Sequence, residues 1–294
     1  MRIRCLLAGA VLPLSLAAQD TTTTKASLMA AERSAISNAT TLRRALTPAA
    51  TVLLPDRPIL HGASMYEAHL ADVSPDRGTI WTSVHAVVAP DGGFGCTTGV
   101  VRRPSADAAH PSAGRYVTCW RRARGGDWRI VALSVLYAPA AVRSLPDTLA
   151  APPGSTGVRG MRRARAAQAM ADADRAFARF SADSGGPAGA FSRWIAADGM
   201  MIGIRDVPVR GPAQVREAFA PFPPHGRFEW GPIDSLARAS RDGSLGFTIG
   251  EARKEPTPGT VSYSKYLTVW RREPDGTYRF IFDTGSDRPA PVTR

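Results

Sequence analysis

Asp283 is the residue of this chain whose type and position best suit acid–base chemistry. It lies in a stretch predicted to be the last strand, where alternation puts Arg279, Ile281 and Asp283 on one face. A carboxylate among apolar side chains has a raised pKa, which suits a general acid or base. A structural alternative is open, in which Asp283 caps a turn at the strand end or pairs with Arg210 or Arg253.

The stretch that contains Asp283 belongs to the second copy of an internal repeat. The segment at 115–122, RYVTCWRR, returns at 265–272 as KYLTVWRR, an offset of 150 residues. Upstream, the segment at 91–99 matches 242–250 at an offset of 151 residues. Solenoid repeats recur about every 20 to 50 residues, so a period this long predicts one domain that is present twice.

The two copies differ where chemistry could reside. Three positions of the second copy stand against different residues of the first: Asp283 against Leu133, Glu251 against Val100 or Val101, and Lys265 against Arg115. If these faces point inward, the second copy has a pocket lined by polar side chains, whereas apolar side chains fill the core of the first copy. Alternatively, Glu251 and Lys265 form a cross-strand ion pair at the rim of the sheet and do not line a pocket. Such a pair contributes about 1 kcal/mol or less to stability. Trp120 and Trp270 occur in both copies, which indicates packing.

Hydrophobic periodicity predicts that helices precede strands in both copies. In the second copy, helices are expected at 166–180, around 191–195 and from 210, and strands at 200–204, 228–239, 244–254, 262–272 and 277–283. In the first copy, helices are expected at 28–37, at 41–46 and from a Ser64–Glu67 capping box, and strands at 51–54, 79–89, 95–103, 115–122 and 128–137.

Helices followed by a run of strands predict an α+β fold. We expect two cone-shaped domains, each a curved antiparallel sheet wrapped around N-terminal helices. The first, degenerate domain is expected at 24–138, a Pro-rich linker at 139–160, and the second domain at 161–288.

Several motifs of the second copy are shared with a known superfamily: Asp174–Phe177, Val209–Gly211, Trp230, and the segments 242–248 and 266–276. With the element order, they resemble the nuclear-transport-factor-2-like superfamily, which includes the SnoaL-like and ketosteroid-isomerase-like proteins, and in particular an exported bacterial branch whose members are mostly of unknown function. The superfamily includes isomerases, cyclases, hydrolases and binding or dimerisation modules, so the chemistry must come from the site.

The resemblance implies a pocket between the concave sheet face and the helices. The expected site consists of Asp283 as acid or base, of Glu251, Tyr263 and Lys265 as binding or orienting groups, and of Trp194 and Trp230 as flat walls. Ketosteroid isomerase, itself the standard example of this chemistry, uses an Asp base and an oxyanion hole of a Tyr and a protonated Asp. Neither that set nor the Asp–His pair of polyketide cyclases has a residue-by-residue match in this chain.

Cys96 and Cys119 lie on strands predicted to be neighbours, joined by a turn centred near Asp107. That register puts the two cysteines opposite each other, and an oxidising compartment would permit a disulfide. Two reduced core thiols are the alternative, since Phe247 and Val269 take these places in the second copy.

The first residues have the pattern of a secretory signal peptide at 1–18. Arg2 and Arg4 precede an apolar run at 5–16, and small residues follow. The run is too short to cross a bilayer, and no later segment is apolar enough. We therefore expect an exported protein, periplasmic or secreted, without a stable membrane anchor.

The formal net charge of +12 comes almost entirely from arginine. The densest basic run, at 162–165, lacks the interleaved aromatic residues of a base-stacking surface, so a solvated basic face is favoured over a nucleic-acid partner. The five histidines have no metal-ligand spacing, and the usual phosphate-loop and nucleophile-elbow motifs do not occur. No metal and no cofactor are expected.

Three functional hypotheses follow. The first is a small, partly apolar ligand in the cone of the second domain. The second, from a different class, is a structural or interaction module whose two copies form an internal pseudo-dimer, with a homodimer as its variant. The third is an isomerase, cyclase or hydrolase that uses Asp283. A ligand site needs a cavity of about 300 Å³ or more, and the enzyme needs Asp283 inside it with a polar partner.

Overall fold

The computed structural model describes residues 14–104, 113–122, 126–138, 150, 163–203 and 207–291, with side chains from position 24 onward except at position 138. The predicted signal peptide falls outside these residues up to position 13, and its last residues lie at the start of a helix. Of the predicted linker, only Ala150 is described.

In the first half of the described chain, residues 14–138, a long helix precedes a sheet. The elements are α1 (Leu14–Ala35), α2 (Ala39–Ala45), β1 (Leu46–Leu53), β2 (Leu60–His61), α3 (Ala63–Tyr66), the 3-10 helices η1 (Glu67–Val73) and η2 (Pro75–Arg77), β3 (Ile80–Val88), β4 (Phe94–Arg102), β5 (Ala113–Arg122) and β6 (Trp128–Ala138).

The second half, residues 163–291, repeats this order with longer helices at its start. The elements are α4 (Arg163–Phe180), a π-helical turn η3 (Ser181–Gly185), α5 (Gly186–Trp194), β7 (Ile195–Ile202), β8 (Val209–Arg210), α6 (Gly211–Phe219), β9 (Arg227–Pro232), the 3-10 helix η4 (Asp234–Leu236), β10 (Arg238–Ala239), β11 (Leu245–Glu255), β12 (Ser262–Arg272) and β13 (Tyr278–Asp287).

Each half builds one sheet, so the predicted α+β class is confirmed and the two sheets fit a two-domain arrangement. Within the described residues, the first sheet has six strands in the order β2-β1-β6-β5-β4-β3, and the second has seven, in the order β10-β11-β12-β13-β7-β8 with β9 paired to β11. The predicted antiparallel pairing holds for β3 to β6 and for β11 to β13, whereas β1 pairs with β6, and β7 with β13, in parallel. In each half a long connection, which contains helices and the other strands of the sheet, joins the two parallel strands.

Local helix signals were only partly identified from the sequence. The predicted capping box at Ser64–Glu67 does not form, because α3 begins at Ala63 after Gly62, which has a φ of 90°. A capping box forms instead at the start of α2, where Asn38 accepts the backbone N–H of Thr41 and the Thr41 hydroxyl accepts that of Asn38.

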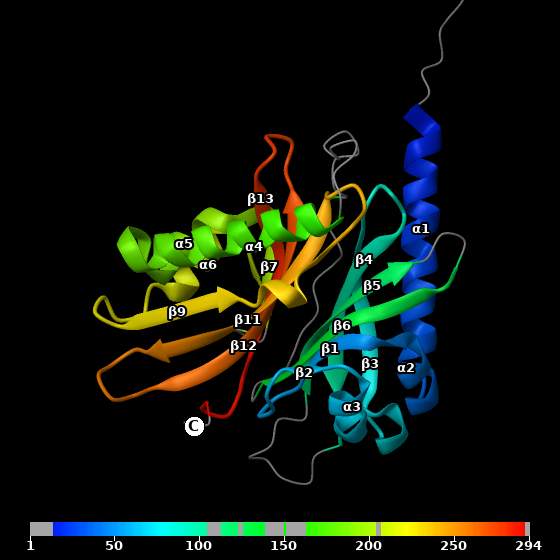
Figure 1. Cartoon of the computed structure of the whole chain (residues 1–294), viewed down its shortest axis with the longest axis horizontal. Helices are drawn as coiled ribbons and strands as arrows, with labels where there is room; N and C mark the ends of the chain where they lie inside the picture. Colours follow the sequence, from blue (N-terminus) through cyan, green and yellow to red (C-terminus); the bar gives the residue numbers. More distant parts are fainter. Residues whose placement is uncertain are drawn as a thin grey trace, which may run out of the picture.

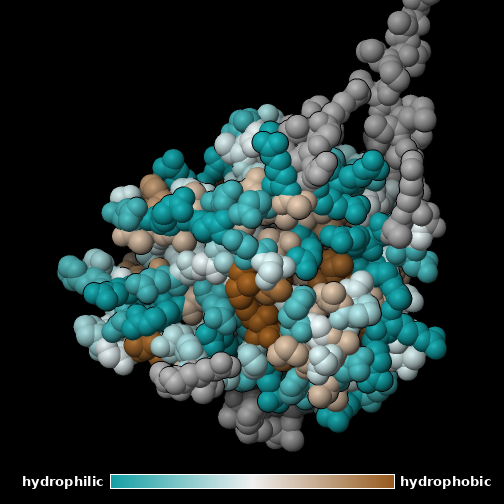
Figure 2. All heavy atoms as spheres, in the orientation of Figure 1, coloured by the Kyte–Doolittle hydropathy of each residue, from teal (hydrophilic) through white to brown (hydrophobic). Residues whose placement is uncertain are grey.

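The two sheets pack against each other, with the helices on the outer sides of the molecule (Figure 1). One apolar cluster, here called the inter-sheet core, contains side chains from both halves, among them Val117, Cys119 and Leu136 of the first sheet and Phe247, Val269 and Phe282 of the second. Phe94 and Phe247 stack across it with ring centroids 6.2 Å apart. Figure 2 shows hydrophobic surface in the middle of this face of the molecule, between the two halves.

A β-bulge in the last strand decides which residues face the helices. Val269 pairs with Phe282 but Trp270 pairs with Phe280, so Ile281 is an extra residue in β13. Phe280 therefore packs among the helices, whereas both Ile281 and Phe282 lie in the inter-sheet core. The prediction that Ile281 and Asp283 share a face is wrong, because the bulge shifts the alternation by one residue.

The first half contains the same bulge. Cys119 pairs with Ala132 and Trp120 with Ile130, which leaves Val131 as the extra residue. Leu133 then returns to the apolar core between the first sheet and its helices. Leu133 and Asp283 thus occupy equivalent places in the two halves.

Candidate functional site

The second half encloses a cavity of about 310 Å³ between its helices and its sheet, here called the cone cavity. Its apolar side is lined by aromatic residues: Phe177, Phe191, Phe219, Phe228 and Trp230. Its polar side is lined by Lys254, Ser264, Tyr266, Thr268, Asp283 and Asp287. An apolar pocket with a few convergent polar groups is the usual form of a small-molecule site.

The aromatic wall is held by ring contacts between separate elements. Phe177 of α4 meets Trp230 of β9 edge to face, with centroids 4.7 Å apart. Phe191 of α5 stacks on Phe219 of α6 at 4.4 Å. Such contacts add about 0.5–1.5 kcal/mol per pair beyond area burial, so the wall is well ordered before any ligand arrives.

Asp283 lies on the polar side of the cone cavity and is 9 % exposed. The Thr268 hydroxyl, directly opposite on β12, donates a hydrogen bond of 2.5 Å to its Oδ1 atom. Burial raises the pKa of Asp283 to about 6, although the Thr268 hydrogen bond and the positive charge of Lys254 oppose the shift. Near neutral pH this carboxyl group can therefore exchange a proton with a ligand.

Two forms of the structural alternative for Asp283, the strand-end cap and the pair with Arg253, do not hold. Strand β13 continues to Asp287, so Asp283 lies within a strand and not at a chain-end turn. Arg253, one of its proposed partners, instead forms an ion pair of 2.6 Å with Glu255.

Asp174, on α4, is a second acidic group behind the cavity wall, and it is 1 % exposed. Its Oδ2 atom accepts hydrogen bonds from Thr248 at 2.7 Å and from the Tyr266 hydroxyl at 3.0 Å. Burial raises the pKa of Asp174 to about 7, and the charge of Asp283 adds to this rise. Its Oδ1 atom has no hydrogen-bond partner within the described part of the chain.

Tyr266 links Asp174 to the cavity, because it lines the cavity while its hydroxyl contacts the carboxylate. Burial, followed by the charge of Asp174, raises the pKa of Tyr266 well above its ordinary value. The phenol therefore stays protonated at physiological pH, and its single hydrogen is donated to Asp174.

Neither Asp174 nor Tyr266 was predicted as a site residue, although both lie in the motifs that resemble the superfamily. A signal for Asp174 was present: it follows Met170 by four residues and precedes Phe177 by three, which puts a carboxylate on the apolar stripe of α4.

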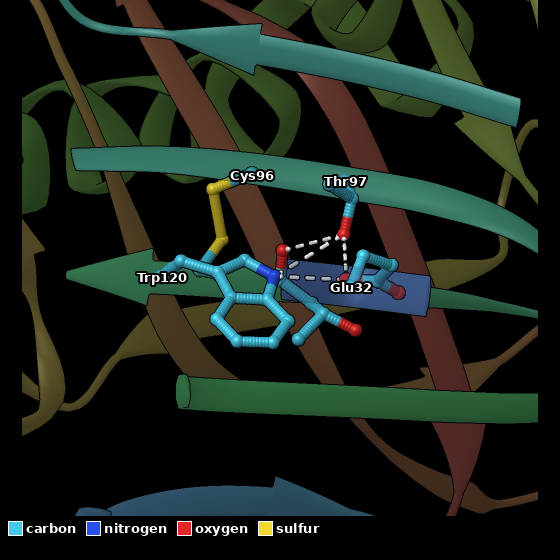
Figure 3. Close-up of a disulfide and its surroundings, with 6 residues drawn as sticks. Glu32, Cys96, Thr97 and Trp120 are labelled. Carbon is cyan, nitrogen blue, oxygen red and sulfur yellow. Dashed lines mark hydrogen bonds between the residues drawn. A yellow bond between two sulfur atoms is a disulfide. The ribbon is translucent and has the colours of Figure 1, made fainter. Parts of the chain in front are cut away.

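A related network occupies the first half (Figure 3). Glu32 of α1 accepts hydrogen bonds from Thr97 at 2.6 Å and from the indole of Trp120 at 2.9 Å. In the second half Trp270 instead donates to Thr248, at 2.8 Å. Trp120 and Trp270 therefore pack, as predicted, and also donate hydrogen bonds into these networks.

The apolar core beside the Glu32 network has no acid at the place that Asp283 takes in the second half. Leu133 stands at the place of Asp283, and Trp81 and Tyr116 pack edge to face in the same apolar cluster, with centroids 4.6 Å apart. Only the second half combines a buried helix carboxylate with an acid on the last strand.

Of the other predicted site residues, Trp230 lines the cone cavity and four do not. Trp194 stacks on Phe177 at 5.6 Å on the helical side and is not part of the lining. Glu251, Tyr263 and Lys265 are likewise absent from the lining, because they share the sheet face of Ile249 and Leu267, which belong to the inter-sheet core.

These three residues have other contacts instead. Glu251 lies opposite Lys265 in the register but forms its ion pair with Arg288, at 2.9 Å. The guanidinium group of Arg288 also lies over the Tyr263 ring, 5.6 Å from its centroid. Lys265 is fully buried and donates a hydrogen bond of 2.8 Å to the Asp287 carbonyl oxygen, and burial lowers the pKa of Lys265 to about 8.

Cys96 and Cys119 are directly opposite in the register, as predicted, and the structure joins them by a disulfide. The bond lies in the inter-sheet core, where it packs against the second sheet. The two cysteines have a sequence separation of 23, and the cross-link is expected to stabilise the fold by about 3 kcal/mol through the unfolded state.

The described residues contain no group of three or more His, Cys, Asp or Glu side chains that could hold a metal ion. None of the helices described is both long and apolar enough to cross a membrane.

Taken together, these features define an α+β protein with two packed mixed sheets and an aromatic-walled, acidic cavity in its second half. No protein-family model matches the chain, and no curated protein matches it.

Solved structures of three bacterial proteins match parts of the chain. A ketosteroid isomerase-like protein from Erwinia carotovora atroseptica is 15 % identical, and the match covers 42 % of this chain and 96 % of that one with a TM-score of 0.33. An NTF2-like protein with a cystatin-like fold from Novosphingobium aromaticivorans is 18 % identical, and the match covers 42 % of this chain and 83 % of that one with a TM-score of 0.32. A nuclear transport factor 2-like superfamily protein from Salmonella enterica is 14 % identical, and the match covers 44 % of this chain and 94 % of that one with a TM-score of 0.32. These structures carry the superfamily names that the sequence motifs resemble. Each covers less than half of this chain, and none assigns chemistry to it.

Proposed function

We propose that the second half of this protein binds a small, partly apolar molecule in the cone cavity, with Asp283 as its main polar contact. One observation carries the proposal: the aromatic cavity contains a buried acid where the otherwise similar first half has Leu133. Burying a carboxyl group lowers the stability of the folded protein, because desolvation disfavours the charged form of the group. Its presence in a cavity of ligand size supports a binding role.

The lining indicates the chemistry of the ligand. The rings of Phe177, Phe191 and Trp230 suit a flat or cyclic apolar body. The polar side offers an acceptor or donor at Asp283 and an acceptor at the Tyr266 hydroxyl, whose own hydrogen is donated to Asp174. We infer a ligand with one or two hydroxyl or carbonyl groups at the end that meets β12 and β13.

Replacing Asp283 by leucine, the residue of the first half, tests this site. A thermal-shift screen of aromatic alcohols and ketones is expected to find ligands that stabilise the wild type. Asp283→Leu should weaken their binding about tenfold or more, because a buried polar ligand group loses its partner. Asp127→Leu, which changes an exposed acid of the first half, should leave their affinity unchanged. The proposal would be contradicted if no compound in the screen stabilised the wild type. It would also be contradicted if Asp283→Leu bound the same ligands as tightly as the wild type.

A second candidate function is acid–base catalysis, and the pair formed by Tyr266 and Asp174 favours it. Asp283 would take a proton from a carbon next to a carbonyl group and return it to another atom of the same molecule. When Asp174 is protonated, it would donate its hydrogen to the Tyr266 oxygen, and Tyr266 would then donate its own hydrogen to the developing oxyanion. An Asp base facing a Tyr and a second acid is also the arrangement used by ketosteroid isomerase, the general example of this chemistry.

Deuterium exchange into 2-tetralone in D₂O tests this candidate. With the wild type, exchange at the carbon next to the carbonyl should exceed the protein-free rate and rise as pH increases through about 6, where Asp283 ionises. Asp283→Asn should lower the rate about a hundredfold, whereas Asp127→Asn should not change it. Exchange that survives in Asp283→Asn would exclude Asp283 as the base.

The remaining expectations concern the whole chain. We propose that the first half acts as a built-in partner in a pseudo-dimer, which the inter-sheet core supports. Export is also part of the proposal, supported by the signal-like residues at 1–18 and by the disulfide.

A further inference from the structure

The charged groups that face the cone cavity are mostly acids. Its lining contains one cation, Lys254, and two carboxylates, Asp283 and Asp287. A third carboxylate, that of Asp174, lies behind the wall, where it accepts the hydrogen of the Tyr266 hydroxyl. Among the described residues, the charges around this cavity therefore favour a positive group inside it over a negative one.

The two acids of the lining lie at different depths. On β13, Asp283 is buried and Asp287 is exposed, with Gly285 between them on the same face. The charge of Asp287 acts on Lys265, the buried lysine on the opposite face of the sheet. Asp283 is therefore the acid that a ligand inside the cavity contacts.

Neutral residues separate Asp283 from the cation of the lining. Strand β12 lies between β11 and β13 and presents three hydroxyl side chains to the cavity: Ser264, Tyr266 and Thr268. Lys254 is on β11, and its ammonium group lies over the Phe228 ring, 5.0 Å from the centroid. It acts on Asp283 through its charge, without a hydrogen bond between them. The Asp283 carboxylate thus has no counter-ion in contact within the described residues.

One oxygen atom of Asp283 is available to a ligand. The Thr268 hydroxyl donates to Oδ1, and no donor of the described chain contacts Oδ2. Burial deprives this carboxylate of most of its hydration, which is the main cause of its raised pKa. An ammonium group at Oδ2 would replace that hydration by a charge-assisted hydrogen bond.

The aromatic wall favours the same charge. The face of an aromatic ring attracts a cation within about 6 Å of its centroid, and Trp does so most strongly. Phe228 already holds one ammonium group in this way, that of Lys254. Phe177, Phe191 and Trp230 line the cavity as well. Rings and a buried acid around one cavity suit an organic cation.

We propose that the ligand of the cone cavity is an organic cation, with a flat or cyclic apolar body and a protonated amine that pairs with Asp283 Oδ2. This rests on the proposed function and adds a charge to the ligand inferred there. The body lies against the aromatic wall, and any hydroxyl or carbonyl group of the ligand lies beside the hydroxyl groups of β12. The first half has no such partner for an amine, because Leu133 takes the equivalent place.

Two probes with the same ring system separate this proposal from the proposed function. 2-Aminotetralin carries an ammonium group at neutral pH, as aliphatic amines do, whereas 2-tetralol carries a neutral hydroxyl group at the same carbon. The alcohol tests the cone cavity alone, and the amine tests the charge. Isothermal titration calorimetry at pH 7.5 should show that the wild type binds the amine at least tenfold more tightly than the alcohol.

Asp283→Asn should remove this preference, because the amide keeps the shape of the side chain and loses its charge. We expect at least tenfold weaker binding of 2-aminotetralin, and binding of 2-tetralol within about threefold of the wild-type value, which also shows that the variant is folded. Asp127→Asn removes the same charge from an exposed position of the first half and should bind both probes as the wild type does. Lys254→Met, which removes the cation of the lining, should bind the amine more tightly and the alcohol equally well.

The pH dependence identifies the acid that is responsible. Affinity for the amine should rise as pH increases through about 6, where Asp283 ionises, and affinity for the alcohol should change much less. The other charged groups around the cavity are the same in wild type and Asp283→Asn: Asp174 and Arg175 on α4, Lys254 on β11 and Asp287 on β13. The difference between the two pH profiles therefore isolates Asp283.

Two results would overturn the cationic ligand and leave the cone site standing. One is wild-type binding of 2-tetralol that equals or exceeds the binding of 2-aminotetralin. The other is a preference for the amine that persists in Asp283→Asn, since the charge would then be recognised elsewhere. If neither probe binds the wild type, both proposals fall.

Discussion

Replacing Phe247 by aspartate is expected to unfold both halves of the protein together. Phe247 is 1 % exposed and packs in the inter-sheet core, where its ring stacks on Phe94 of the other half. The substitution removes a large apolar side chain, which costs about 3–5 kcal/mol, and buries an unpaired charge in addition. The sum is comparable with the total stability of a typical domain.

Urea denaturation followed by circular dichroism measures this effect. Phe247→Asp should show no cooperative transition or a midpoint near zero denaturant, while Phe247→Leu should lose only about 1 kcal/mol. Ile80→Asp is the control, because Ile80 is 64 % exposed on a strand of the first sheet, and its midpoint should stay near the wild-type value. If Phe247→Asp unfolds only the second half and leaves the first with its own transition, the two sheets do not depend on a shared core.

The second large effect is expected from Glu32, whose replacement by glutamine should stabilise the protein at alkaline pH. Burial raises the pKa of Glu32 from its ordinary value of 4.5 to about 7, although the hydrogen bonds from Thr97 and others oppose the shift. The folded state therefore binds this proton more tightly than the unfolded state. Its contribution to stability is fully present below about pH 4.5 and is lost as pH rises through about 7.

The magnitude follows from the pKa difference and is about 3 kcal/mol at most. Glutamine keeps an oxygen that can accept the hydrogen bonds from Thr97 and Trp120 and never ionises. We expect nearly equal free energies of unfolding for wild type and Glu32→Gln near pH 4, and a variant that is more stable by up to about 3 kcal/mol at pH 8.

The comparison is made by urea denaturation at a series of pH values. Taking the difference between variant and wild type cancels the titration of Asp174 and Asp283, which is present in both. Glu217→Gln, at an exposed position of α6, should follow the wild type at every pH. A Glu32→Gln variant that also follows the wild type at every pH would show that the carboxyl group is not buried as the structure has it.

Much of the fold could be predicted from the sequence because it depends on local patterns. Alternation and turn residues predicted β3 to β6 and β11 to β13 within a few residues of their observed ends. The register that places Cys96 opposite Cys119 also followed from the spacing of the strands. The parallel pairs of β1 with β6 and of β7 with β13 did not, because they join segments distant in sequence.

The site was predicted less completely, and the bulge at Ile281 is one reason. Strict alternation placed Asp283 on the face of Ile281, whereas the extra residue moves it to the face of Phe280 and into the cavity. The assignment of Glu251 and Lys265 to the cavity failed for a related reason: alternation defines two faces but does not say which one the helices cover. Packing of the second sheet on the first covers their face instead.

The sequence by itself determined the repeat, the order of helices and strands, and the single most informative contrast, an acid in the second half where the first half has Leu133. Only the tertiary structure decided which face of each sheet is inside, that Tyr266 donates a hydrogen bond to Asp174, 92 residues away in sequence, and that the charge of Asp283 acts on Asp174. The reason is physical. Periodicity and turn chemistry act between residues close in sequence, whereas burial, pKa shifts and shared walls arise only when distant segments exclude water from one another.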